Sequence, residues 1–93
     1  MVKVLYFGNI RATIGKDEEE LALTTDTTAY QLLQKLAGVY GVSFQNEIFN
    51  KNELRDDLMI TRNNAVLAHS SVSEILLQPG DILALYPIFP GGG

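Results

Sequence analysis

Both ends of the chain carry a short strand pattern that is largely apolar on its two faces. Residues 2–7 are Val-Lys-Val-Leu-Tyr-Phe and residues 82–86 are Ile-Leu-Ala-Leu-Tyr, which are rich in β-branched, aromatic and aliphatic types. Strands that are apolar on both faces usually lie in the interior of a sheet. We therefore expect the first and last strands to lie side by side at the centre of one sheet, where they would run parallel.

An amphipathic helix is predicted to begin at Ala29. Thr28, followed three residues later by Gln31, fits a capping box, and Gly41 suits the end of the helix. Apolar side chains recur at the offsets that line one side of a helix. These side chains are Ala29, Leu32, Leu33, Leu36, Ala37 and Tyr40.

The segments on either side of this helix are less regular. Residues 19–24 alternate between polar and apolar types, which predicts a strand buried on one face and joined to the first strand by a turn at residues 15–17. Residues 44–56 are polar with spaced apolar side chains, and we expect a loop with no more than one short helical turn.

Two further strands are predicted at residues 58–61 and 65–68, around a turn at Asn63-Asn64. Gln78-Pro79-Gly80-Asp81 has Pro and Gly at the central positions of a type II turn, and the last strand follows it. The expected fold is α+β, with a mixed sheet and one main helix packed on one face. This is the ubiquitin-like β-grasp arrangement.

Composition excludes several kinds of chemistry. The 93 residues suffice for one domain, and they include no cysteine, which excludes disulfides, thiolate metal sites and a cysteine nucleophile. The single histidine, His69, argues against a histidine metal site or a catalytic triad.

No apolar run approaches the ~20 residues that span a bilayer, and the first residues do not resemble a signal peptide. We expect a cytoplasmic protein with no membrane partner.

The net charge of −4 argues against nucleic acid as a partner, because phosphate contacts need clustered Lys and Arg. The one dense charged run is Asp17-Glu18-Glu19-Glu20. We interpret this run as the solvated edge of a hairpin in preference to a docking patch.

The chain ends in Phe89-Pro90-Gly91-Gly92-Gly93, directly after the last strand. A glycine tail has no side chains, so its carboxylate can enter a channel too narrow for other residues. Pro87 and Pro90 favour an extended stem that points away from the sheet. We expect a domain at residues 1–89 and a flexible tail at residues 90–93, although an inert, frayed end is the simpler interpretation.

A carboxylate is a poor electrophile, so chemistry at the tail requires activation, most simply as an acyl-adenylate. The chain has neither a Walker-type phosphate loop nor a dinucleotide fingerprint. We therefore expect no cofactor bound to the chain itself, and ATP to be used by an activating partner.

Residues 4–11 (Val-Leu-Tyr-Phe-Gly-Asn-Ile-Arg), Ile14-Gly15, and residues 79–87 (Pro-Gly-Asp-Ile-Leu-Ala-Leu-Tyr-Pro) with the glycine tail resemble the MoaD family. These proteins are the ubiquitin-like small subunits of molybdopterin synthase and are related to the thiamine sulfur carrier ThiS. The leucines of the predicted helix fit as well, so the resemblance covers nearly the whole chain.

The resemblance implies a sulfur carrier. Its C-terminal glycine would be adenylated by an enzyme similar to the ubiquitin-activating enzymes and converted to a thiocarboxylate. The tail would enter the large subunit of molybdopterin synthase and deliver sulfur to a pterin precursor of the molybdenum or tungsten cofactor. The family usually ends in two glycines, here Gly91-Gly92, so Gly93 is extra. The reactive residue would be Gly93, or Gly92 after trimming.

Large apolar residues beside the tail are the candidate partner surface. For Phe7 and Leu85 a role in the core is favoured, whereas an interface is favoured for Ile88 and Phe89. The candidate site comprises Gly93 and Gly92 as the reactive end, and Phe7, Leu85, Tyr86, Ile88, Phe89, Pro90 and Gly91 as partner contacts.

Three alternatives stay open. The chain could be a sulfur carrier for thiamine or for tRNA thiolation, or a ubiquitin-like modifier that is joined to lysines. It could also be a β-grasp interaction module with an inert tail. Chain length and the Tyr-Phe-Gly start favour the molybdopterin branch.

Overall fold

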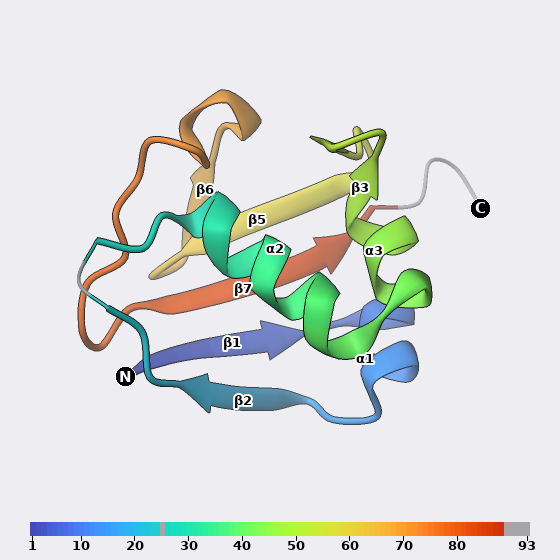
Figure 1. The fold of residues 1–93 in the computed structure, drawn as a ribbon, viewed down its shortest axis with the longest axis horizontal. Helices are drawn as coiled ribbons and strands as arrows, with labels where there is room; N and C mark the ends of the chain where they lie inside the picture. Colours follow the sequence, from blue (N-terminus) through green and yellow to red (C-terminus); the bar gives the residue numbers. More distant parts are fainter. Residues whose placement is uncertain (25, 89–93) are drawn as a thin grey trace.

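The computed structural model describes residues 1–24 and 26–88 and contains a five-stranded mixed sheet (Figure 1). Its strands are β1 (Val2–Tyr6), β2 (Glu18–Leu21), β5 (Leu58–Arg62), β6 (Ala65–Leu67) and β7 (Ile82–Pro87). They lie in the order β2-β1-β7-β5-β6. As predicted, β1 and β7 are parallel neighbours inside the sheet, and the other pairs are antiparallel.

Helices cover one face of this sheet, which confirms the predicted α+β β-grasp arrangement (Figure 1). The main helix is α2 (Ala29–Tyr40), and it begins and ends as expected. Thr28 Oγ1 accepts a hydrogen bond from the backbone N–H of Gln31 at 3.1 Å, and Gln31 Oε1 accepts one from the Thr28 N–H at 2.9 Å. Gly41 ends the helix with φ of 91°.

The helix α1 (Gly8–Ile14) was not predicted from the sequence, and it lies between β1 and β2 in place of a tight hairpin connection. Its sequence signal is weak, because the N-cap residue Phe7 makes no side-chain capping bond and Ile10 is its single buried side chain. A helix this short is stabilised chiefly by packing against the rest of the protein.

The loop expected at residues 44–56 is also more regular than predicted. It contains α3 (Val42–Ile48), whose Phe44 and Ile48 are both fully buried, and a small hairpin of β3 (Phe49–Asn50) and β4 (Glu53–Leu54). Phe44 and Ile48 are four residues apart and therefore lie on one face of the helix. Two buried apolar residues in a largely polar segment are too few to predict that helix from periodicity.

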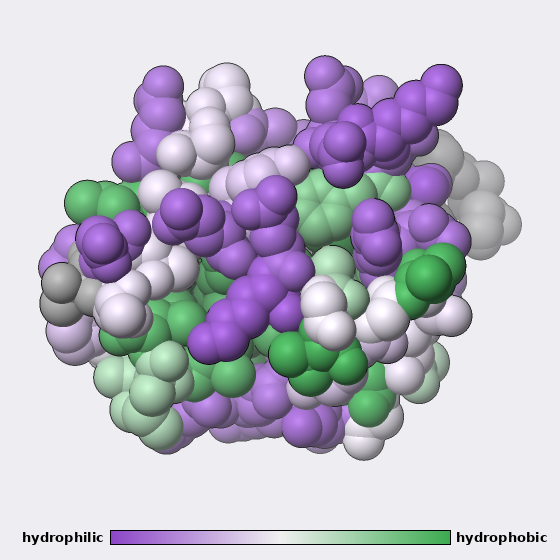
Figure 2. Space-filling model, viewed as in Figure 1, coloured by the Kyte–Doolittle hydropathy of each residue, from purple (hydrophilic) through white to green (hydrophobic). Residues whose placement is uncertain are grey.

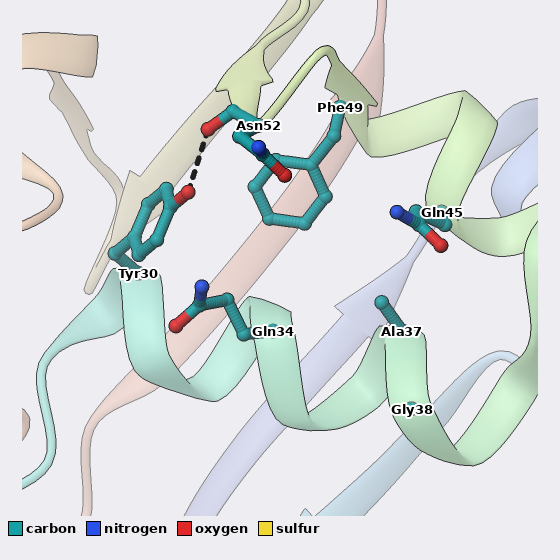
Figure 3. Close-up of a pocket in the computed structure, with 7 residues that line it drawn as sticks. All are labelled: Tyr30, Gln34, Ala37, Gly38, Gln45, Phe49 and Asn52. Atoms are coloured by element: carbon teal, nitrogen blue, oxygen red, sulfur yellow. Dashed lines mark hydrogen bonds between the residues drawn. The ribbon is translucent and has the colours of Figure 1, made fainter.

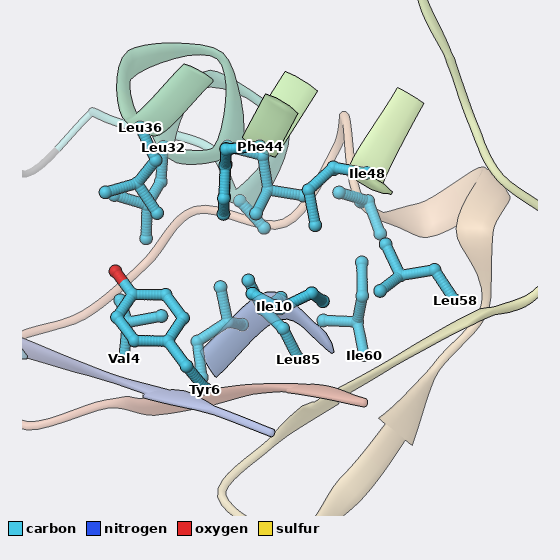
Figure 4. Packing of buried hydrophobic residues seen from close by; sticks show 14 of the residues in the cluster. Val4, Tyr6, Ile10, Leu32, Leu36, Phe44, Ile48, Leu58, Ile60 and Leu85 are labelled. Atoms are coloured by element: carbon cyan, nitrogen blue, oxygen red, sulfur yellow. The ribbon is translucent and has the colours of Figure 1, made fainter. Parts of the chain in front are cut away.

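The core lies between the sheet and the helices (Figure 4). Val4 and Tyr6 of β1, with Leu85 of β7, face Leu36 of α2 and Phe44 of α3 across this layer. The outer side of the helix layer is mixed in hydropathy, with hydrophilic residues over the first part of α2 and pale or hydrophobic residues toward its end (Figure 2). The strands therefore bury their most apolar face under one layer of helices.

At the start of β7, Asp81 stabilises the predicted turn. Gly80 has φ of 88° and the Asp81 N–H donates to the Gln78 carbonyl at 3.0 Å, as a type II turn requires. The buried Asp81 carboxylate accepts hydrogen bonds from the Gln78 N–H at 2.8 Å and from Asn63 Nδ2 at 3.0 Å. This carboxylate ties the β5–β6 turn to the turn before β7.

The acidic run is not uniformly solvated. Asp17 and Glu18 are exposed, as an edge strand favours, but the Glu19 side chain is only 17% exposed. Glu19 Oε1 accepts hydrogen bonds from the hydroxyls of Tyr6 and Tyr40, each at 2.5 Å. Lys16 Nζ lies 3.3 Å from Glu19 Oε2. The predicted solvated edge is therefore wrong for Glu19, which joins β2 to β1 and to α2.

This cluster shifts the pKa values of its members. Burial alone would raise the pKa of Glu19, but the hydrogen bonds from Tyr40, Tyr6 and Lys16 outweigh burial and hold it below the ordinary value. Burial first, and then the bond to Glu19, raises the pKa of Tyr6. A lowered carboxyl pKa stabilises the fold above the ordinary value of about 4.3, and this stabilisation is lost as the pH falls through the folded value.

We predict that Glu19→Gln lowers the free energy of unfolding at neutral pH by about 1–3 kcal/mol, because two hydrogen bonds to a charged group are weakened. Below about pH 4 the difference from wild type should shrink, because Glu19 is then protonated in the unfolded chain and begins to protonate in the folded one. Urea unfolding at neutral and acid pH measures both effects. Glu20→Gln, an exposed residue of the same strand, is the control. Equal stability of the two variants would contradict the prediction.

Candidate functional site at the root of the C-terminal tail

β7 ends at Pro87, and residues 88 and 89 stand between it and the expected tail at residues 90–93. One further hydrogen bond follows Pro87: the Ile88 N–H donates to the Asp57 carbonyl at 2.6 Å. The chain is therefore anchored through Ile88. The predicted reactive residues Gly92 and Gly93, and the predicted contacts Phe89, Pro90 and Gly91, lie outside the described residues.

Two aromatic rings stack next to the end of β7. Phe7 follows β1, Tyr86 lies in β7, and their ring centroids are 4.4 Å apart with an interplanar angle of 11°. Both residues are half-buried. The parallel pairing of β1 with β7 brings the two rings together, since Tyr6 is opposite Leu85 in the register.

The stacked rings belong to the sheet face that points away from the helices. Alternate side chains of a strand point to opposite faces, and Tyr6 and Leu85 face the helices. The opposite face of the three central strands therefore presents apolar side chains, which we call the open face. The open face consists of Leu5, Phe7, Met59 and Tyr86, which surround the buried Ala84.

The residues predicted as partner contacts fall into different environments. Phe7 and Tyr86 lie on the open face, and Ile88 is 45% exposed next to it. Leu85 is 0% exposed and packs in the core. Leu85 offers no surface to a partner, so we assign it to the core and keep it out of the docking surface.

Two residues that contact Pro87 and Ile88 were not predicted from the sequence, namely Gly8 and Asp57. Arg55 holds the Asp57 carboxylate with two bonds, Nε to Oδ1 at 2.9 Å and Nη2 to Oδ2 at 3.0 Å. These bonds from Arg55 hold the pKa of Asp57 below its usual range. Gly8 packs against the ring of Pro87. Neither contact has a local sequence signal, because each joins segments that are far apart in the chain.

A separate cleft of about 230 Å³ lies between α2, α3 and the β3–β4 hairpin (Figure 3). The Tyr30 hydroxyl donates to the Asn52 carbonyl at 2.6 Å across one end of this cleft, and the Tyr30 ring meets Phe49 edge-on at 5.5 Å. None of the residues predicted at the functional site lines this cleft, so we do not include it in the candidate site.

Within the described residues, no group of three or more His, Cys, Asp or Glu side chains is arranged to hold a metal ion. His69 Nε2 lies 2.6 Å from the Leu58 carbonyl, which places this ring at the start of β5. No helix in the described part of the chain has the length and apolar character needed to cross a membrane. What the described residues offer at this site is an apolar sheet face beside the end of β7.

Comparison with known proteins agrees with this geometry. The ThiS family model matches residues 4–92. The molybdopterin synthase sulfur carrier subunit of Drosophila yakuba is 30% identical over 91 residues, which cover 98% of this chain and 90% of that protein.

Solved structures show the same fold. A putative molybdopterin converting factor, subunit 1, from Pyrococcus furiosus is 27% identical with a TM-score of 0.74, and the match covers 95% of this chain and 97% of that one. The small archaeal modifier protein 1 from Methanosarcina acetivorans is 28% identical with a TM-score of 0.79, over 98% of this chain and 95% of that one. These matches confirm the ubiquitin-like β-grasp fold.

Proposed function

We propose a function for this chain, which belongs to the ThiS family. Its resemblance to the MoaD proteins, which are related to ThiS, predicted this membership. The chain is a sulfur carrier and acts as the small subunit of molybdopterin synthase. One observation supports this most strongly: after a central strand, whose end is anchored beside an apolar sheet face, and three further residues, the sequence runs into glycines. Such an arrangement presents the terminus to a partner that covers the open face.

The reaction begins at the carboxylate of the terminal glycine, Gly93 or a trimmed Gly92. A carboxylate oxygen attacks the α-phosphate of ATP on an activating enzyme, and pyrophosphate leaves. A sulfur nucleophile from a donor then attacks the carbonyl carbon of the acyl-adenylate, and AMP leaves. The sulfur of the resulting thiocarboxylate attacks an electrophilic carbon of the acceptor and displaces a leaving group from it. Water then hydrolyses the acyl–sulfur bond, which leaves the sulfur on the acceptor and restores the carboxylate. Because the chain has no cysteine, the sulfur is held at the terminus itself.

The partners follow from this chemistry. One is a ubiquitin-activating-type adenylating enzyme, and the other is the large subunit of molybdopterin synthase. A family relative is named as the sulfur carrier subunit of that synthase, which supports this choice. The open face and Ile88 form the proposed docking surface, since large apolar groups next to the tail lose their contact with water when a partner covers them.

We predict that Ile88→Asp weakens binding to a matched large subunit by at least about tenfold, a change of about 1.4 kcal/mol, because a charge enters an apolar contact. The melting temperature should stay close to that of wild type, since the Ile88 side chain is 45% exposed. Isothermal titration calorimetry measures the affinity. Val42→Asp, at a residue that is 69% exposed in α3, is the matched control. Unchanged affinity of Ile88→Asp would exclude this docking surface.

A second candidate is a ubiquitin-like modifier, which the similarity to the small archaeal modifier protein 1 favours. A lysine amine would then attack the carbonyl carbon of the same acyl-adenylate, AMP would leave, and an isopeptide bond would form. One assay separates the functions: the chain is incubated with the activating enzyme, ATP, a sulfur donor and the large subunit. Thiocarboxylate formation and binding to the large subunit support the synthase role. Stable lysine conjugates would support the modifier, and a thiocarboxylate without large-subunit binding would support a thiamine or tRNA carrier.

A further inference from the structure

The backbone at Gly8 comes close to the ring of Pro87, the last residue of β7. Gly8 has φ of 56°, a conformation that side chains rarely adopt, and a Cβ placed on it would lie 2.7 Å from Pro87 Cγ. Among the glycines of the described residues, Gly15, Gly38, Gly41 and Gly80 would meet no heavy atom within 4 Å. Of these glycines, Gly8 is therefore the one where a neighbour, the ring of Pro87, leaves no room for a side chain.

Residues 86–88, which we call the stem, each have a partner on a different part of the fold. Tyr86 stacks on Phe7, at the end of β1. Pro87 packs on Gly8, at the start of α1. Ile88 donates its N–H to the carbonyl of Asp57, just before β5.

Arg55 braces the residue that accepts the last of these bonds. Its bidentate contact with the Asp57 carboxylate, at 2.9 and 3.0 Å, restrains the segment between β4 and β5. The stem is thus restrained from the β1–α1 side and from the β4–β5 side. We call the contacts of Gly8 and Asp57 with the stem the stem clamp.

We propose that Gly8 and Asp57 are positioning residues, which fix the direction in which the tail leaves the sheet and so place the terminal glycine for activation. This inference rests on the proposed sulfur-carrier function. Proline has a fixed φ, so the path of the chain after Pro87 depends on where its ring is seated. A misplacement of about 1 Å at a reacting group can cost about 100-fold in rate. The stem clamp therefore affects the chemical step, whereas docking depends on the open face.

The test compares Gly8→Ala with Gly15→Ala. Both glycines have positive φ and lie at opposite ends of α1, but only the methyl group introduced by Gly8→Ala would collide with Pro87. The assay measures pyrophosphate release from ATP by a matched activating enzyme as the concentration of the carrier chain is varied. For Gly8→Ala, kcat should be at least about tenfold lower than for wild type, and the KM for the carrier chain should stay within about twofold. Gly15→Ala should keep both values near wild type. An equal loss of kcat in the two variants would overturn the proposal.

Rescue distinguishes the ring contact from general strain. The close contact is to Pro87 Cγ, an atom that alanine lacks. In a Pro87→Ala background, Gly8→Ala should therefore change kcat by less than about twofold, a non-additive result typical of residues in contact. A full loss of kcat on adding Gly8→Ala to that background would overturn the proposal.

A second readout needs no partner. The Ile88 amide should exchange with solvent faster in Gly8→Ala than in Gly15→Ala, because the displaced ring breaks the bond to Asp57, and hydrogen exchange followed by NMR measures this. Unchanged Ile88 exchange in Gly8→Ala would overturn the stem clamp. If the wild-type chain is not adenylated, the sulfur-carrier function fails, and the Ile88 exchange still decides whether the stem clamp exists.

Discussion

Removing Gly92 and Gly93 is expected to abolish thiocarboxylate formation while the folded domain stays as stable as the full chain. Both residues lie beyond Ile88, whose bond to Asp57 is the last backbone contact among the described residues, and the buried core of that part of the chain is drawn from residues 2–85. The shortened chain should still bind its partner through the open face. Intact-protein mass after incubation with the activating enzyme, ATP and a sulfur donor measures the loss, and thermal unfolding measures the stability.

The matched control for this deletion removes Gly93 alone, which leaves the Gly91-Gly92 ending usual in the family. Activity of this control would show that Gly92 can serve as the reactive residue, whereas its inactivity would assign the chemistry to Gly93. Normal sulfur transfer by the chain that lacks both glycines would contradict the proposed function and favour an interaction module with an inert tail.

Leu85→Ala is expected to destabilise the domain by about 2–5 kcal/mol, a large fraction of the about 5–15 kcal/mol that typically stabilises a folded protein. Leu85 is 0% exposed and lies opposite Tyr6 and Ile60 in the register of the central strands. Removing its side chain leaves a cavity at the centre of the core (Figure 4). Urea unfolding gives the free energy directly.

Ile88→Ala is the control for Leu85→Ala, and it should change the free energy of unfolding by no more than about 0.5 kcal/mol, because Ile88 is 45% exposed. The two residues differ in environment although they are three apart in the chain. A stable Leu85→Ala variant that had lost its partner would contradict the assignment of Leu85 to the core.

Much of the fold was predictable, because its signals are local. The capping box at Thr28 and the glycine at Gly41 defined α2, and each bond of that capping box is present. The type II turn at Gly80 was likewise defined by residue types that a positive φ requires. The parallel pair of β1 and β7 followed from hydrophobicity, since the two most apolar strands lie inside the sheet.

The two short helices were not predictable in the same way. α1 has one buried residue, Ile10, and α3 has two, Phe44 and Ile48, so neither segment shows a clear 3.6-residue period. Both helices are stabilised by tertiary packing, which a local pattern does not record.

Of the candidate site, the sequence predicted the tail and the aromatic residues beside it, but not their anchoring. The contact of Gly8 with Pro87 depends on the relative position of the first and last strands. The role of Glu19 was hidden for the same reason, because its partners Tyr6 and Tyr40 come from two other elements. Residue types alone do not reveal contacts of this range.

The central claim is that the terminal glycine is the group that holds sulfur, and mass spectrometry of the C-terminal peptide tests it most directly. After incubation with the activating enzyme, ATP and a sulfur donor, one carboxylate oxygen should be replaced by sulfur. Oxidation of Met1 or Met59 changes the mass of the whole chain by nearly the same amount, so the change must be located by fragmentation. Sulfur on Gly93 or on a trimmed Gly92 is the predicted result. An unmodified C-terminal peptide, with an enzyme that is active on its own carrier, would contradict the claim.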